Sequence, residues 1–114
     1  LLINAVDSIA VSDNCDHGKI LLTTRDITEK DDNSVNNSQT IELTVRDNGT
    51  GIAREEIDNI FDPFYTTKEP GKGTGLGLSV SYMIVEQFGG TITVKSELNK
   101  GTAMSIYLQV SHEF

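Results

Sequence analysis

Four glycines at every second position, Gly71, Gly73, Gly75 and Gly77, stand directly before an apolar stretch with helical periodicity. Inside a regular element each glycine costs about 0.5–1 kcal/mol of chain entropy relative to alanine, so the run indicates a backbone with an unusual path. A helix N-terminus carries unpaired N–H groups and partial positive charge, and flanking glycines let the chain approach an anion closely. The run therefore favours a phosphate site, with a flexible surface linker as the alternative.

Two familiar phosphate motifs do not fit this run. The P-loop pattern GxxxxGK[ST] needs a glycine five places before Gly71, where the chain has Thr66. The dinucleotide pattern GxGxxG fails at every register, because its last position falls on Leu76, Leu78 or Val80. The sequence therefore excludes both a P-loop and a Rossmann-type phosphate site here.

The chain opens with LLINAVDSIA, whose apolar residues recur at helical spacing and predict a helix over residues 1–12. Asn4, Asp7 and Ser8 are spaced i, i+3 and i+4, so they share one polar face of this helix. The amide oxygen of Asn4 suits Mg²⁺, a hard cation that prefers oxygen ligands, with a capping or core amide as the alternative. Because the helical pattern starts without a cap, we expect a single domain over 1–114 that lacks its first strand and the start of its first helix.

The segment RDNGTGI follows a predicted strand over 40–47, in which Ile41, Leu43 and Val45 alternate with polar residues and face inward. Gly49 and Gly51 permit a tight turn there, and Asp47 would point its carboxylate into the cleft that the turn borders. A charge-assisted hydrogen bond from an exocyclic amine to such a carboxylate is worth about 1.5–3 kcal/mol. Asp-Asn-Gly is also a common turn sequence, so an ordinary hairpin turn is the alternative.

Helical and strand patterns alternate along the rest of the chain. A short helix is predicted over 52–61, and a longer one over 76–88 that ends at Gly89-Gly90. The apolar residues of the longer helix recur at i, i+4, i+8 and i+12, as Leu76, Val80, Ile84 and Phe88. The other predicted strands lie at 19–24, 91–98 and 102–110. This order predicts an α/β fold in two layers, with a mixed sheet and helices on one face.

Composition excludes several classes of function. The 114 residues carry a formal net charge of −8, which argues against nucleic acid or an anionic membrane as the main partner. No apolar run approaches the ~20 residues that a membrane span needs. Cys15 is the only cysteine, so an intrachain disulfide is impossible and a reducing compartment is the simplest setting.

The order of these motifs resembles the ATP-binding catalytic domain of bacterial sensor histidine kinases, a GHKL fold of the two-layer α/β sandwich type. NAVDSI is similar to the N box of that family, DNGTGI to its G1 box, FDPFYTTK to its F box and GKGTGLGLS to its G2 box. GGTITVKSELNKGTAMSIYL is similar to its closing hairpin. The F and G2 boxes resemble those of nitrogen-regulation-like kinases with a short lid.

The resemblance implies a role for each matching residue and two cofactors, ATP and Mg²⁺. Asp47 would accept a hydrogen bond from the adenine 6-amino group, Asn4 would hold Mg²⁺ and Lys68 would reach the terminal phosphates. The glycine run would form the hinge and phosphate-facing backbone of a flexible lid that closes over ATP, with Phe61 and Phe64 as packing anchors. No residue is assigned as catalytic. The implied ATP-binding residues are Asn4, Asp7, Ser8, Asp47, Gly49, Gly51, Ile52, Thr67, Lys68, Gly73, Thr74, Gly75, Leu76, Gly77 and Thr102.

The resemblance also implies partners outside this chain. The γ-phosphoryl group would pass to a histidine on a separate dimerisation domain of a homodimeric, cytoplasmic parent protein, and from there to a response regulator. Whether the parent is membrane-anchored is left open, and His112 is not expected to be the phosphoacceptor because it follows a strand. The alternatives are another GHKL ATPase, a serine kinase of the anti-sigma type, or a nucleotide-binding module without catalysis. The residue one helical turn before Asn4, a glutamate in the ATPases, would distinguish hydrolysis from transfer.

Overall fold

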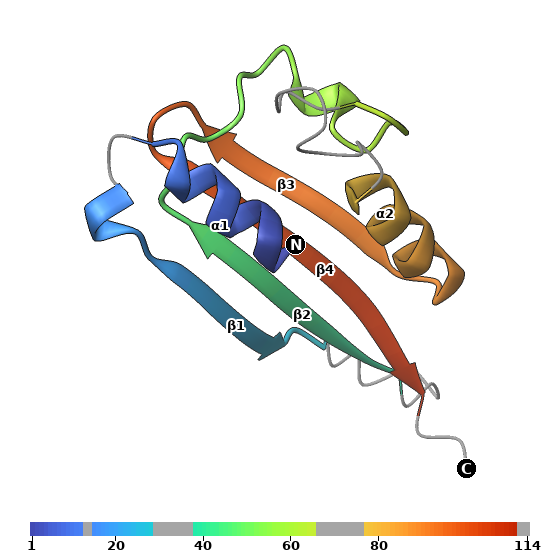
Figure 1. Ribbon diagram of the computed structural model, residues 1–114. Coiled ribbons are helices and arrows are strands. Elements are labelled where there is room, and N and C mark those ends of the chain that lie inside the picture. Colours follow the sequence, from blue (N-terminus) through green and yellow to red (C-terminus); the bar gives the residue numbers. More distant parts are fainter. Residues whose placement is uncertain (13–14, 29–37, 66–76, 112–114) are drawn as a thin grey trace.

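The computed structural model describes residues 1–12, 15–28, 38–65 and 77–111 (Figure 1). Its sheet has the order β1-β2-β4-β3, and helices lie on one face, with α1 packed on β2 and α2 on β3. This arrangement confirms the predicted two-layer α/β fold with helices on one face. The elements are α1 (Leu2–Ala10), β1 (Ile20–Asp26), β2 (Ser38–Asp47), α2 (Gly77–Gln87), β3 (Thr91–Glu97) and β4 (Gly101–Ser111), with short 3₁₀ helices at Cys15–His17 and Ile57–Asn59.

All three strand pairings in the described part of the chain are antiparallel, whereas the sequence led us to expect a mixed sheet. The connection from β2 through α2 to β3 does make β2 and β3 run in the same direction. However, β4 turns back directly after β3 and inserts between them. The two strands with parallel directions are therefore not neighbours, and no parallel pairing results.

Strand alternation separates an inner face under the helices from an outer face. The predicted inward set of β2 is confirmed by its register, since Val45 pairs with Met104 and Leu43 with Ile106 on β4. The outer face is polar and includes a hydrogen bond of 2.9 Å between Thr44 Oγ1 and Ser105 Oγ. The most buried apolar residues gather between the sheet and the segments that cover it: Ala5, Val45, Ile60, Val85, Ile92 and Met104.

The longer predicted helix is confirmed, but it buries a different face from the apolar series that predicted it. Val80, Ile84 and Phe88 are 42%, 48% and 74% exposed, while Val85 is buried. An i, i+4 series advances by about 40° around the helix at each step, so it leaves any one face after two or three steps. Of the described α2 residues only Val85 is therefore buried, where the series predicted several.

Gly89 ends α2 as predicted, in a left-handed conformation with φ of +71°. Its N–H donates to the Glu86 carbonyl and the Gly90 N–H donates to the Val85 carbonyl, both at 2.9 Å. This pair of bonds is a Schellman motif, which satisfies two carbonyl groups at the helix end.

The short helix predicted over 52–61 is wrong in its extent, because the structure forms only a turn and the three-residue 3₁₀ helix Ile57–Asn59 there. The Ile52 N–H donates instead to Ser96 on β3 at 2.7 Å, which holds the start of the segment in a tertiary contact. So short a segment gains little from helical hydrogen bonds alone. None of the helices within the described ranges is long and apolar enough to cross a membrane.

Substitution of the two methionines of the chain tests the position of the core. Met104 is 7% exposed on β4, whereas Met83 is 53% exposed on α2. We expect Met104→Ala to lower the free energy of unfolding by about 2–5 kcal/mol, because it removes buried apolar contacts and leaves a cavity. Met83→Ala should change it by less than about 0.5 kcal/mol. Urea denaturation measures both values, and equal effects would contradict the assigned core.

Candidate functional site

Polar side chains replace the apolar core at one end of the inner face. Asp47 pairs with Thr102 across β2 and β4, and Thr102 pairs with Ser96 across β4 and β3. The three residues therefore form one row on the helix-covered side of the sheet, directly beyond the Val45–Met104 pair. Asp47 is 9% exposed and Thr102 is 8% exposed. Polar side chains meet on the helix-covered face in this row, so it is a candidate site for a polar ligand.

The Asp47 carboxylate is partly engaged by its own loop. One oxygen, Oδ1, accepts the Gly49 N–H at 2.9 Å. No hydrogen bond to the second oxygen occurs within the described ranges, and no buried side-chain nitrogen or oxygen in those ranges lacks a partner. The second oxygen therefore keeps some contact with solvent, from which a ligand could donate a hydrogen bond to it.

Residues 47–52, which we name the Asp47 loop, are held on one side by α1 and by the chain before β1. The Thr50 N–H donates to Ser8 Oγ at 3.1 Å, and the two hydroxyl oxygens lie 3.2 Å apart. The Asn48 side chain accepts the Lys19 N–H at 2.8 Å and donates to the His17 carbonyl at 2.9 Å. The loop is therefore fixed by side chains from two neighbouring segments, which an ordinary hairpin turn would not require.

The other side of the Asp47 loop is held by the β3–β4 hairpin. The Asn99 N–H donates to the Thr50 carbonyl at 2.6 Å, and the Ile52 N–H donates to Ser96 Oγ at 2.7 Å. Gly51 has φ of +71°, and a Cβ there would overlap the Glu97 carbonyl oxygen. Gly101 has φ of +123°, and a Cβ there would overlap the Asp47 carbonyl oxygen. Both positions require glycine because the backbones touch.

The structure brings several predicted site residues together. Asp47, Gly49, Gly51, Ile52 and Thr102 all belong to the sheet end or its loop, as the hydrogen bonds and pairings above show. Ser8 lies against this loop through Thr50, and a Cβ on Gly49 would overlap the Ser8 hydroxyl oxygen.

The other predicted site residues lie on the helices or outside the described ranges. Asn4 and Asp7 are half-buried on α1, with Asn4 about 6 Å, or one turn, before Ser8 along the helix axis. Gly77 is exposed at the first position of α2. Six predicted residues lie outside the described residues: Thr67, Lys68, Gly73, Thr74, Gly75 and Leu76.

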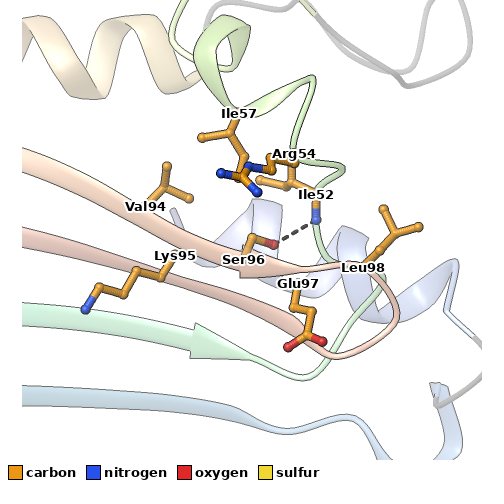
Figure 2. Close-up of a pocket in the computed structure, with 8 residues that line it drawn as sticks. All are labelled: Ile52, Arg54, Ile57, Val94, Lys95, Ser96, Glu97 and Leu98. Atoms are coloured by element: carbon orange, nitrogen blue, oxygen red, sulfur yellow. Dashed lines mark hydrogen bonds between the residues drawn. The ribbon is translucent and has the colours of Figure 1, made fainter.

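A cavity of about 510 Å³ lies between β3 and the segment that follows the Asp47 loop (Figure 2). Figure 2 shows Ile57 and Arg54 on the same side of β3 as Val94, with Ser96 bonded to Ile52 at the far end. Asp47 and Asn4 do not line this cavity; its lining is Ile52, Arg54, Ile57, Val94, Lys95, Ser96, Glu97 and Leu98. Sequence reasoning missed Ser96 as a site residue, although its register opposite Thr102 in the hairpin could have indicated it.

Aromatic residues flank the segment that carries the glycine run. The rings of Phe61 and Tyr82 pack with their centroids 5.5 Å apart, which joins the chain before the run to α2. A hydrogen bond to Glu86 and the charge of that carboxylate raise the pKa of Tyr82. Partial removal from water and the nearby Glu56 carboxylate raise the pKa of Tyr65. Phe61 thus packs as predicted, whereas Phe64 is 73% exposed with φ of 66°.

The two-layer fold and the buried carboxylate beside a glycine-bearing loop define the class of this molecule, an α/β domain with a polar candidate site at one end of its sheet. The sequence profile described as "Histidine kinase-, DNA gyrase B-, and HSP90-like ATPase" matches residues 1–112. The chain therefore belongs to this family.

Two relatives are sensor or sporulation kinases. Sensor kinase CckA of Brucella abortus (strain 2308) is 42% identical over 113 residues, which cover 95% of this chain and 11% of CckA. Sporulation kinase D of Bacillus subtilis (strain 168) is 52% identical over 69 residues, which cover 60% of this chain and 13% of that protein. The chain thus spans a small fraction of the curated relatives it matches.

Solved structures share the fold. The nucleotide-free catalytic domain of histidine kinase ThkA has a TM-score of 0.68 at 30% identity, covering 94% of this chain and 59% of that one. Full-length ShkA in complex with AMPPNP has a TM-score of 0.68 at 24% identity, covering 99% of this chain and 21% of that one. The predicted class, an ATP-binding catalytic domain of the sensor histidine kinase type, is confirmed; the nitrogen-regulation-like subgroup stays a prediction.

Substitution of Gly51 tests the contact between the Asp47 loop and the hairpin. We expect Gly51→Ala to lower the free energy of unfolding by about 1–3 kcal/mol, because a Cβ meets the Glu97 backbone in a left-handed conformation. Gly77→Ala is the matched control, since a Cβ there has open space and alanine favours a helix. Thermal denaturation of both variants measures the difference, and equal stabilities would contradict the close approach at Gly51.

Proposed function

We propose that this chain binds Mg²⁺–ATP at the Asp47 end of its sheet and positions the γ-phosphoryl group for transfer to a histidine. The observation that carries the proposal is the buried Asp47 carboxylate, with one oxygen held by the Gly49 N–H and the other still in contact with solvent. A carboxylate held in this way accepts a hydrogen bond from an exocyclic amine, such as the 6-amino group of adenine. Family membership supports the same ligand.

The described residues fit a purine at this end of the site. Ile52 supplies an apolar side chain at the end of the Asp47 loop. At Gly51 the main chain of the loop lies directly against the β3–β4 hairpin. The Asp47 loop is fixed by contacts with Ser8 and Asn99 before any ligand arrives. A preformed edge of this kind loses little entropy on binding, which favours affinity.

The phosphate end would be formed by α1 and the start of α2. Asn4 presents an amide oxygen on the same side of α1 as Ser8, and such oxygens are suitable ligands for Mg²⁺. The N-terminus of α2 at Gly77 carries the partial positive charge of the helix dipole, which suits a phosphate. The cation would neutralise phosphate charge, and the residues of this chain would hold the nucleotide in position, which is the main contribution of protein to phosphoryl transfer.

The acceptor and the partners lie outside this chain. We propose a phosphoacceptor histidine on a dimerisation domain of the same homodimeric protein, and a response regulator that receives the phosphoryl group next. The names of two relatives, a sensor kinase and a sporulation kinase, support a kinase role for the whole protein. We place the domain in the cytoplasm, where ATP is available.

Asp47→Asn tests the contact with the base. The amide oxygen would still accept the Gly49 N–H, so the amide nitrogen would face the adenine 6-amino group, donor against donor. We expect ATP affinity to fall about thirtyfold, or about 2 kcal/mol, for both Asp47→Asn and Asp47→Ala. Calorimetry with Asp58→Asn, an exposed aspartate of the 3₁₀ helix, provides the control and should match the unaltered chain. Unchanged affinity in both Asp47 variants would remove this carboxylate from the site.

Asn4→Ala tests the metal. If the Asn4 amide is a ligand of Mg²⁺, its loss should reduce the dependence of ATP affinity on Mg²⁺ concentration. Asn59→Ala, another exposed residue of the 3₁₀ helix, should retain that dependence. Titrations with ATP at micromolar and millimolar Mg²⁺ measure the effect. A dependence as strong in Asn4→Ala as in the unaltered chain would contradict the assignment.

A further inference from the structure

Ser96 lies at the centre of a hydrogen-bonded group that joins β3, β4 and the Asp47 loop. Its Oγ lies 2.7 Å from the Ile52 nitrogen, 2.7 Å from Thr102 Oγ1 and 3.0 Å from the Gly101 carbonyl oxygen. Thr102 is in turn the cross-strand neighbour of Asp47. Only Thr102 therefore lies between Ser96 and the Asp47 carboxylate, to which we assign the contact with the adenine base.

All three contacts can be hydrogen bonds at the same time with only one set of directions. A serine hydroxyl carries one hydrogen and two acceptor lone pairs. The Ile52 N–H can only donate and the Gly101 carbonyl can only accept, so Ser96 accepts from the first and donates to the second. The remaining lone pair of Ser96 faces Thr102, and the 2.7 Å contact is then a hydrogen bond donated by the Thr102 hydroxyl.

This direction determines what Thr102 can offer to a ligand. With its single hydrogen given to Ser96, the Thr102 hydroxyl presents only lone pairs to the site. The neighbouring Asp47 carboxylate also presents only acceptor oxygens. The two side chains thus form an edge that accepts hydrogen bonds and donates none. The amino group of a 6-amino purine can donate hydrogen bonds to that edge. The oxygen of a 6-oxo purine is itself an acceptor, so the edge repels it.

We propose that Ser96 is a positioning residue for base selection, which keeps Thr102 an acceptor and so excludes 6-oxo purine nucleotides. The inference rests on the proposed ATP site. Without the Ser96 hydroxyl, the Thr102 hydroxyl is released to rotate and can donate to a 6-oxo group. Ser96 therefore acts on specificity through Thr102, without touching the nucleotide itself.

The test compares ATP with inosine triphosphate, which differs from ATP at the 6-position and N1 edge of the purine. We expect Ser96→Ala to reduce the ratio of ATP to inosine triphosphate affinity about five- to tenfold, the effect of one hydrogen bond. A merely structural role of Ser96 would weaken both nucleotides equally and leave this ratio unchanged. Displacement of a fluorescent ATP analogue from the 114-residue chain measures both affinities.

Two further variants make the comparison specific. Ser96→Thr keeps a hydroxyl at the same position and should retain most of the ratio. Ser105→Ala is the matched control, because Ser105 also pairs with a threonine hydroxyl, that of Thr44, but on the outer face of the sheet. It should leave the ratio unchanged.

The outcomes separate this inference from the proposed function. An unaltered chain that fails to bind ATP contradicts the proposed site itself. An unaltered chain that binds ATP, with the same ratio in Ser96→Ala, overturns the role of Ser96 alone. If Ser96→Ala does not fold, NMR spectroscopy of the unaltered chain tests the role of Ser96 instead. A slowly exchanging Thr102 hydroxyl proton close to Ser96 supports the inference, and a rapidly exchanging one overturns it.

Discussion

The close approach of the Asp47 loop to the β3–β4 hairpin is the constraint on which the site depends. A side chain at Gly101 would overlap the Asp47 carbonyl, and one at Gly51 would overlap the Glu97 carbonyl. Both neighbours are backbone atoms of the sheet, so no rotamer change could relieve the overlap. Two glycines therefore fix the loop against the hairpin, and the position of the Asp47 carboxylate follows from that contact.

Electrostatics at the site are set by this packing before a ligand binds. Asp47 and Thr102 are buried, and Ser8, Gly49, Ser96 and Asn99 supply hydrogen bonds to the loop or its neighbours. The chain as a whole carries a formal net charge of −8, which repels a triphosphate. Affinity must therefore come from local groups. In our proposal these are a carboxylate for the base, and an amide oxygen, a cation and main-chain N–H groups for the phosphates.

Local patterns predicted the parts of the molecule that local physics determines. The alternation of Ile41, Leu43 and Val45 predicted the inner face of β2, and Gly89 predicted the end of α2. The resemblance in motif order predicted that Asp47 and Thr102 both belong to one ATP site, and the structure places them side by side. Features that depend on distant segments were missed. The sheet is antiparallel because β4 inserts between β2 and β3, and Ser96 matters because that insertion places its hairpin partner Thr102 beside Asp47.

We propose that Mg²⁺–ATP binds where α1, the Asp47 loop and the start of β4 meet. An NMR titration of the ¹⁵N-labelled chain with Mg²⁺–ATP tests it most directly. We expect the amide signals of Asn48–Ile52, Thr102 and the Asn4–Ser8 turn to shift on binding, while those of Thr44 and Ser105 on the outer face stay unchanged. Shifts confined to the outer face, or an Asp47 loop that does not respond at saturating nucleotide, would contradict it.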